Sequence, residues 1–565
     1  MNRIGTTYLL LVLLLSACHD YEVIVRGGTV YDGSGATPII ADIGIQGDTI
    51  AFIGDLSEMS AATEIDAEGK AVAPGMINAL SWAGRTFFSD GRSMSDLKQG
   101  VTLEVFGEGS SLGPYKRTEE ARSKGAIGTF GEHMQELERK GVSTNIASFV
   151  GATTVRQYVL GNEDTLPTVE QLQEMQQLVA NSMEEGALGV GSSLIYAPAF
   201  FASTEELVAL AKTASVYGGV YTSHMRSEGD RFLEALDELL YIAAAADIPA
   251  EIHHLKAAGE INWHKLDEVL ARIDSVNHAG LTITTNMYTY TGASTGLWAC
   301  LPPWVRAGGK KKWMERLQDP EIRAQVIAEM ESEETEWENF YRAAGKPENI
   351  LLLEFDVDSL NQYIGMDLGE VATIRETSPA ETIIDLLVEN QSGIGAVYFL
   401  MSEENVRKQM QLPYMSFCSD ARSVAAEGKE LESMTHPRTF GNFARLLGKY
   451  VREEKVLSLE EAIHKATALP AQKFNIQKRG TLKPGYYADV IVFDPDRIAD
   501  KATFRKPHQY AVGMEHVLVN GVRVIANGEH TGETPGQFVK GPGYGKEVSV
   551  ESWKVTEQLA VNSEQ

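Results

Sequence analysis

Short apolar runs of strand type alternate with amphipathic helical stretches through residues 74–470 of the chain. Strands separated by helices of about a dozen residues form βαβ units, in which the strands lie parallel. The pattern therefore predicts an α/β fold, a (β/α)8 barrel of the TIM type. The strand-like runs lie at 101–106, 187–191, 219–222, 250–253, 282–286 and 414–418, with helical patterns such as 168–185 and 204–216 between them.

Both ends of the chain show a different sequence pattern, in which short β-type runs are separated by turn residues. Residues 18–73 and 471–545 are predicted to form one small β-sandwich beside the barrel. Residues 304–380 are longer and more charged than an ordinary crossover, so we expect an insertion there that could serve as a lid. Residues 546–565 are polar and are expected to form a C-terminal tail.

The first 17 residues are predicted to be a signal peptide. Arg3 precedes an apolar stretch at 8–15 that is too short to span a bilayer. It ends in Leu15-Ser16-Ala17-Cys18, which resembles a bacterial lipobox. This resemblance implies cleavage before Cys18 and lipidation of its thiol, hence a lipoprotein of the bacterial cell envelope, on the periplasmic side or the cell surface, with the lipid as its membrane contact. The alternative is a plain secretory signal.

The composition limits the kinds of molecule that the protein is expected to bind. The 565 residues include 78 acidic and 50 basic side chains, for a net charge of −28. This charge argues against a nucleic-acid partner, whose phosphates require a basic face. The two remaining cysteines, Cys300 and Cys418, are far apart in sequence, and we expect two buried free thiols rather than a disulfide.

Two histidines carry the candidate chemistry. His224 and His254 each end a short apolar run, and about a dozen helical residues separate the two runs. On adjacent parallel strands of a barrel, both rings would point into the mouth at its C-terminal face. Two imidazoles that converge at such a place can hold a catalytic zinc ion.

At these and other positions the chain resembles the N-acyl-D-amino-acid deacylases, or D-aminoacylases, of the amidohydrolase superfamily. The resemblance covers nearly the whole mature chain and implies a metal-dependent barrel hydrolase with a β-sandwich from both termini. Besides the two histidine runs, it is carried by AVAPGMIN at 71–78, GVT at 100–102, ASTEEL at 202–207, YTYT at 288–291, LPPW at 301–304, SD at 419–420, HPR at 436–438 and GTLKPG at 480–485.

The chain departs from the family at two metal positions. Leu80 and Trp82 stand where the first barrel strand usually carries His-x-His, and the loop after the second strand has no cysteine. Since a carboxylate can replace a thiolate on zinc, we take Glu108 as the ligand from that loop, with Glu104 as the second choice. The prediction is a divergent subgroup with one zinc ion on Glu108, His224 and His254 and one open position.

Strand parity selects His254 over its neighbour His253. Residues two apart share a face of a strand, so His254 points the same way as Lys256. By resemblance Lys256 contacts the substrate, so His253 is expected to be a packed residue on the opposite face.

The resemblance also implies roles for residues around the metal. Asp420 matches the family's general base, and Arg438 is expected to join Lys256 in binding a substrate carboxylate. Tyr288 is expected to donate its hydroxyl to the oxyanion, with Tyr290 as the alternative.

Together these features predict a zinc-dependent amidohydrolase that cleaves small N-acyl-D-amino acids to a carboxylate and a free D-amino acid. Two alternatives remain open from the sequence. One is a hydrolase of another amide, a dipeptide or a cyclic amide, on the same fold. The other is a lipoprotein that kept the barrel for binding but lost catalysis, which the missing first-strand histidines would favour.

Overall fold

Eight parallel strands form the centre of the computed structural model, which describes residues 19–116 and 128–554. The third strand is broken into β8 and β9, and β8 pairs with β7 while β9 pairs with β10. The first and last strands meet where the Ala79 N–H donates to the Phe417 carbonyl oxygen. The predicted (β/α)8 barrel is therefore confirmed. Its strands are β6 (Met76–Asn78), β7 (Val101–Phe106), β8 (Asn145–Ser148), β9 (Val150–Gly151), β10 (Gly189–Ser193), β11 (Val220–His224), β12 (Ala250–Ile252), β13 (Ile283–Met287) and β17 (Met415–Phe417).

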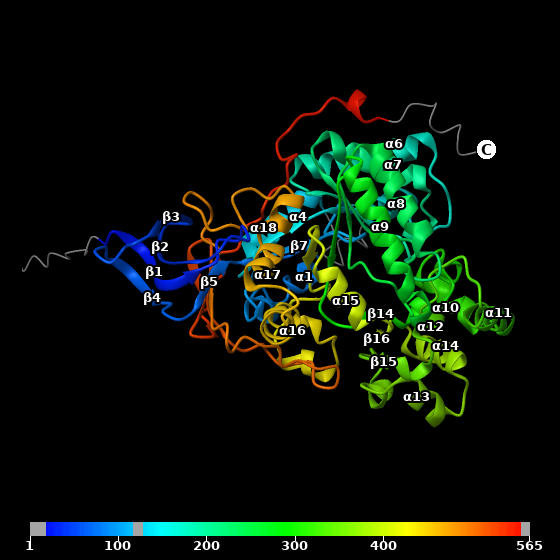
Figure 1. The fold of residues 1–565 in the computed structure, drawn as a ribbon. Coiled ribbons are helices and arrows are strands. Elements are labelled where there is room, and N and C mark those ends of the chain that lie inside the picture. The colour runs from blue at the N-terminus through cyan, green and yellow to red at the C-terminus, as the bar shows by residue number, and fades with distance from the viewer. Residues whose placement is uncertain (1–18, 117–127, 555–565) are drawn as a thin grey trace, which may run out of the picture.

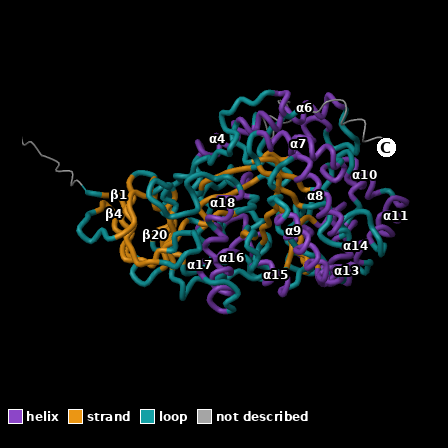
Figure 2. Tube along the Cα trace, turned by 45° about the horizontal axis from the view of Figure 1, so that its top comes forward, coloured by secondary structure: helices purple, strands orange, loops and turns teal. Residues whose placement is uncertain are grey.

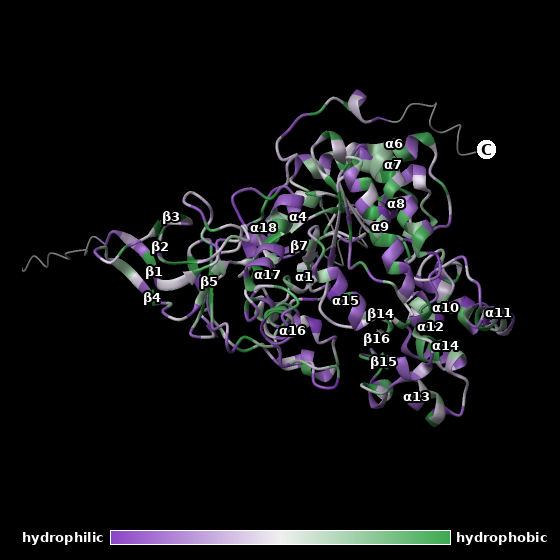
Figure 3. Ribbon diagram, in the orientation of Figure 1, coloured by the Kyte–Doolittle hydropathy of each residue, from purple (hydrophilic) through white to green (hydrophobic). Residues whose placement is uncertain are grey.

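Amphipathic helices surround these strands. Two of them begin where the sequence indicates, because Thr168 and Ser203 cap the first turns of α6 and α7. Hydrophobic and hydrophilic residues alternate along the outer helices, as one-sided burial requires (Figure 3). The helices of this layer are α4 (Phe130–Lys140), α5 (Ala152–Leu160), α6 (Val169–Glu184), α7 (Thr204–Val216), α8 (Phe232–Ala246), α9 (Leu266–His278), α15 (Glu403–Met410), α16 (Arg438–Arg445), α17 (Leu459–Ala466) and α18 (Ala468–Lys473), with the short α1 (Ala83–Thr86) and α2 (Met94–Leu97) after β6.

Strands from both termini join in one nine-stranded sheet at one end of the molecule (Figures 1 and 2). The connection is made by β5, which pairs with β1 on one side and β18 on the other. Side chains from both chain ends, among them Ile43, Val72 and Val490, share one apolar core. The strands are β1 (Tyr21–Val30), β2 (Ile39–Gln46), β3 (Thr49–Gly54), β4 (Ala61–Asp66), β5 (Ala71–Pro74), β18 (Val490–Phe493), β19 (Met514–Val519), β20 (Val522–Ala526) and β21 (Glu529–His530).

The chain after β21 leaves this sheet and crosses the barrel toward α6 (Figure 1). The Gly536 N–H donates to the Val142 carbonyl oxygen, and Phe538 and Trp553 are buried in the barrel's apolar core. The last part of the predicted range 471–545 therefore packs on the barrel, because these large side chains find their apolar surface there.

A separate unit follows β13. Its three strands form a small sheet in the order β14-β16-β15, and helices cover it. The predicted insertion at 304–380 lies inside this unit, whose first strand begins before it and whose last strand ends after it. The unit contains β14 (Gly292–Gly296), α10 (Lys310–Gln318), α11 (Pro320–Met330), α12 (Phe340–Ala344), β15 (Ile350–Leu352), α13 (Leu368–Arg375), α14 (Pro379–Asn390) and β16 (Gly395–Phe399).

The predicted signal peptide and Cys18 lie outside the described residues. Within 19–116 and 128–554, no helix is both long enough and apolar enough to cross a bilayer. Cys300 and Cys418 are buried free thiols, as predicted.

Candidate metal centre and active site

Three buried side chains meet at the C-terminal end of the barrel. Glu108 follows β7, His224 is the last residue of β11, and His254 lies two residues beyond β12. The turn before Glu108 depends on Gly107, at φ +103°, where an added Cβ would lie 2.3 Å from the Phe149 carbonyl oxygen. The barrel therefore brings the three expected ligands together, although they are 146 residues apart in sequence from first to last.

The donor atoms fit a small divalent cation. Glu108 Oε1 lies 3.0 Å from His224 Nδ1 and 3.0 Å from His254 Nε2. Bonds of about 2.0–2.2 Å in a tetrahedron would set neighbouring donors roughly 3.3 Å apart, so only a small adjustment separates this triad from a zinc site. One carboxylate and two imidazoles are also a donor set that zinc accepts. Among the residues described, this is the one group of three or more such side chains with metal-site spacing.

A fourth buried residue, Glu228, lies beside both histidines and is hydrogen-bonded to His254. Its Oε1 accepts from His254 Nδ1 at 3.0 Å, and its Oε2 lies 3.6 Å from His224 Nε2. Lys256 Nζ donates to the same carboxylate at 2.6 Å. A carboxylate behind a metal-binding imidazole fixes the ring's tautomer and orientation. Glu228 was not among the residues predicted from the sequence, although it lies four residues after His224.

These contacts shift the titration of the cluster. Burial would raise the pKa of Glu228, but Lys256 and the two imidazoles outweigh burial and lower it. Burial likewise opposes the ionised form of Glu108, yet His254 and His224 hold its pKa well below the usual range. Burial and Lys256 lower the pKa of His254, but Glu228 and Glu108 raise it to about 9. The cluster thus holds a dense set of opposite charges on side chains that are almost fully buried.

The metal cluster opens onto a cavity at this end of the barrel, and Asp420, just beyond β17, also lines it. Trp82 Nε1 donates to its Oδ1 at 2.9 Å, and Arg438 Nη1 lies 2.8 Å from its Oδ2. The backbone φ angles of Asp420 and His254 are positive, at +47° and +36°, a conformation that residues other than glycine rarely adopt. Such strain concentrates at functional sites. Leu80 is buried and offers no donor atom.

The two expected substrate-binding cations are already engaged by acids. Lys256 contacts Glu228, and Arg438 contacts Asp420. Both also lie over the ring of Tyr288, with Arg438 Cζ 4.4 Å and Lys256 Nζ 5.8 Å from the ring centroid.

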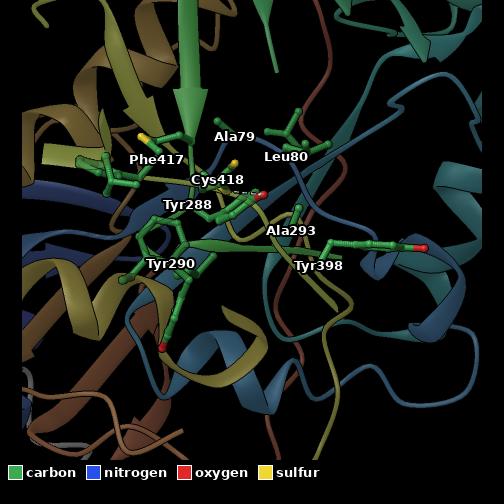
Figure 4. Close-up of a cluster of buried hydrophobic side chains, with 14 of the residues drawn as sticks. Ala79, Leu80, Tyr288, Tyr290, Ala293, Tyr398, Phe417 and Cys418 are labelled. Carbon is green, nitrogen blue, oxygen red and sulfur yellow. Dashed lines mark hydrogen bonds between the residues drawn. The ribbon is translucent and has the colours of Figure 1, made fainter. Parts of the chain in front are cut away.

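The two candidate tyrosines have different surroundings. Tyr288 lines the cavity, and its hydroxyl donates to the Met401 sulfur at 3.4 Å. Tyr290 donates to Asp500 and is not among the residues that line the cavity. Figure 4 shows the two hydroxyls pointing in different directions.

The second choices of the sequence analysis lie elsewhere. Glu104 is buried inside β7 and accepts a hydrogen bond from Asn78 at 2.9 Å. His253 is buried and its Nδ1 lies 2.9 Å from the Asn286 amide nitrogen, so it is a packed side chain.

The cavity measures about 620 Å³, and the unit after β13 supplies one of its walls. Two aromatic residues of this cavity were not predicted. Tyr196 lies 5.3 Å from His224 and 5.1 Å from Trp298 between ring centroids, and its hydroxyl contacts Thr295. Tyr196 lies in the loop after β10 and Trp298 in a 3-10 helix (Leu297–Cys300) after β14, and no apolar pattern indicates the course of either segment.

Known proteins share this architecture. A model of the amidohydrolase family matches residues 433–525. The D-aminoacylase of Alcaligenes xylosoxydans xylosoxydans is 30% identical over 93% of this chain and 98% of its own. A solved D-aminoacylase, in which one metal activates and a second metal attenuates, is 31% identical, with a TM-score of 0.76 over 92% of this chain and 100% of that one.

A third relative is the N-acyl-D-glutamate deacylase of Bordetella bronchiseptica, solved with zinc and a phosphonate inhibitor that mimics the tetrahedral intermediate. It is 29% identical, with a TM-score of 0.76 over 92% of this chain and 99% of that one. Given the barrel, the grouped metal-binding side chains and these matches over almost the full length, the chain belongs to the D-aminoacylase family of amidohydrolases.

Proposed function

We propose that this protein is a metal-dependent amidohydrolase that cleaves N-acyl-D-amino acids to a carboxylate and a free D-amino acid. The observation that carries the proposal is the meeting of Glu108, His224 and His254 in one cavity with Asp420. The relatives named above act on substrates of this class, which supports the same class here.

We further propose zinc as the metal, with one ion bound. Glu108, His224 and His254 would hold it and leave a coordination position open. The first-strand positions that the family uses for a second ion offer no ligand, since Leu80 is apolar and the Trp82 indole nitrogen is a donor already used by Asp420.

When bound, the metal polarises the amide carbonyl and lowers the pKa of water to about 7. The other tasks belong to the chain. Asp420 accepts a proton from the attacking water and delivers it to the departing amine. Trp82 and Arg438 hold its two carboxylate oxygens in place meanwhile.

The hydroxyl of Tyr288 is proposed to stabilise the negative charge that develops on the carbonyl oxygen. Tyr196, packed on His224, is a second candidate for this task. Separate replacement of each by phenylalanine distinguishes them, because the true donor supports kcat more than substrate binding.

Lys256 and Arg438 are proposed to bind the α-carboxylate of the substrate. Their stacking over the Tyr288 ring places both charges on one side of the cavity. When the substrate carboxylate binds, Lys256 must contact both that carboxylate and Glu228. Arg438 must likewise contact both the substrate carboxylate and Asp420.

Hydrolysis of a matched substrate panel tests this function. N-acetyl-D-leucine, N-acetyl-L-leucine, a Leu-Leu dipeptide and dihydrouracil would be offered to the zinc-loaded protein. We expect rapid release of D-leucine and rates at least a hundredfold lower for the others. A preference for the dipeptide or the cyclic amide would favour the alternative hydrolases, and no turnover with tight binding would favour a binding protein.

The location of the protein is a separate proposal. We propose that Cys18 is lipidated and anchors the protein to a membrane of the bacterial envelope, as its lipobox-like setting suggests. A Cys18→Ser variant should move from the membrane fraction to the soluble fraction or remain unprocessed. Equal membrane association of the variant and the parent protein would contradict the anchor.

A further inference from the structure

Arg306 differs from the other cations of the active-site cavity. Lys256 and Arg438 face Glu228 and Asp420, and Arg422 lies 3.7 Å from Glu354. Arg306 lines the same cavity but has no acidic partner and no side-chain hydrogen bond among the described residues. Its Nη1 is buried without a partner. It is thus a positive charge that the fold itself leaves unneutralised.

Aromatic packing holds this guanidinium in place. Its Cζ lies 3.6 Å from the ring centroid of Trp298 and 5.4 Å from that of Trp313. Burial lowers the pKa of Arg306 to about 10, so it remains charged at neutral pH. A partly buried charge without an acidic partner is unfavourable, and an anion brought by a ligand would relieve that cost.

Successive ring contacts connect Arg306 to the metal cluster. The His224 ring packs on Tyr196, Tyr196 packs on Trp298, and Trp298 stacks on Arg306. Tyr196, Trp298 and Arg306 line one part of the cavity. Lys256 and Arg438 lie over the Tyr288 ring, which lines another part. A substrate whose α-carboxylate is bound at Tyr288 would therefore present another part of its structure to Arg306.

We propose that Arg306 binds a second carboxylate of the substrate, distinct from the α-carboxylate. This inference rests on the proposed function and adds to it a preference for dianionic N-acyl amino acids. The second carboxylate has two possible chemical sources. It belongs either to an acidic amino-acid side chain or to the far end of a dicarboxylic acyl group. In both cases a planar guanidinium offers a carboxylate two parallel hydrogen bonds.

Two substrate pairs test the subsite, each pairing a carboxylate with its neutral amide. N-acetyl-D-glutamate is compared with N-acetyl-D-glutamine, and N-succinyl-D-leucine with N-succinamoyl-D-leucine. We expect the wild-type protein to prefer the charged member of one pair by at least tenfold in kcat/KM, and the pair that shows it identifies the source. Arg306→Gln should abolish this preference while changing the rate with the neutral member less than threefold.

Arg422→Gln is the matched control, because Arg422 lines the same cavity but already faces acids. It should retain the preference. Arg306→Lys, which keeps the charge but loses the planar stack, should retain part of it and serves if Arg306→Gln fails to fold. Equal wild-type rates within both pairs, or equal losses for both members of a pair in Arg306→Gln, would overturn the subsite.

A result that refutes the proposed function can be distinguished from one that refutes the Arg306 subsite. If the wild-type protein hydrolyses none of the four compounds, that function is wrong, and the same compounds become stable ligands for calorimetry. Tighter binding of a charged member, lost in Arg306→Gln, would still support the subsite. Equal binding of charged and neutral members would refute it.

Discussion

At the scale of single residues, Glu228 is a buried acid of the metal cluster that is not itself an expected ligand. It accepts hydrogen bonds from His254 and Lys256 and lies 3.6 Å from His224 Nε2, so it orients the His254 ring directly and adds a negative charge beside His224. Its removal should loosen the metal site without removing a donor atom.

Glu228→Gln is therefore expected to weaken zinc binding by about 10- to 100-fold, the usual effect of losing such a supporting carboxylate. Competition with a fluorescent zinc chelator measures the change. Glu354→Gln, a cavity carboxylate that faces Arg422, should leave the affinity unchanged. An unaltered affinity in Glu228→Gln would contradict the supporting role.

Trp82 is expected to position the general base. Trp82→Phe keeps an aromatic ring but removes the 2.9 Å hydrogen bond to Asp420. Hydrogen bonds to charged groups contribute about 1.5–3 kcal/mol, so we expect kcat to fall about tenfold or more, with KM and zinc content unchanged. A kcat within twofold of the wild-type value would show that Asp420 does not depend on the indole.

The residues that sequence reasoning identified share a simple feature. Glu108, His224 and His254 each lie at or just beyond the end of a recognisable strand, so the barrel alone places them at one end. Glu228, Tyr196 and Arg306 lie in loops after such strands or in the added unit. Their positions depend on loop paths that neither apolar periodicity nor spacing specifies.

At the scale of elements, the helix α2 and the strand β7 meet through two buried acids. Asp96 and Glu104 are both buried, and their carboxyl groups interact with each other. Burial raises the pKa of Asp96 to about 6, and burial together with Asp96 raises that of Glu104 well above its usual range. The folded pair thus keeps protons that the unfolded chain would release.

An acid with a raised folded-state pKa favours folding at low pH, and this contribution is lost as pH rises from the unfolded pKa, near 4, through the folded one. Asp96→Asn should therefore raise the melting temperature by a few degrees at pH 8 and by less at pH 5. Thermal unfolding at both pH values measures the effect. A gain that is larger at pH 5 would reverse the expected sign.

Element prediction succeeded where hydrophobic periodicity was strong. The helices α6 and α7 begin at their capping residues, and the barrel strands follow the apolar runs. The bounds of the added unit were harder to predict, because β14 is the sequence GASTG, which has no apolar alternation. Its pairing with β16, about a hundred residues later, is set by tertiary contacts.

At the scale of the whole molecule, the metal cluster links strands that are distant in sequence. Glu108, His224 and His254 lie at the ends of three different barrel strands, so a bound ion would couple these strands. Because the pKa of His254 is raised to about 9, that ring carries a proton at pH 7 that it must lose to bind a metal.

Zinc binding to the metal-free protein at pH 7 should accordingly release about one proton, and its affinity should increase as pH rises toward 9. Calorimetric titrations in buffers of different ionisation enthalpy count the protons. Binding without proton release would show that His254 is neutral before the metal arrives, or is not a ligand.

The central claim is that Glu108, His224 and His254 hold one catalytic zinc ion. Its most direct test is elemental analysis of the purified mature protein and of Glu108→Ala, with N-acetyl-D-amino-acid hydrolysis measured on the same samples. We predict about one equivalent of zinc in the parent protein, and loss of both zinc and hydrolysis in the variant. Full zinc content and undiminished hydrolysis in Glu108→Ala would contradict the account.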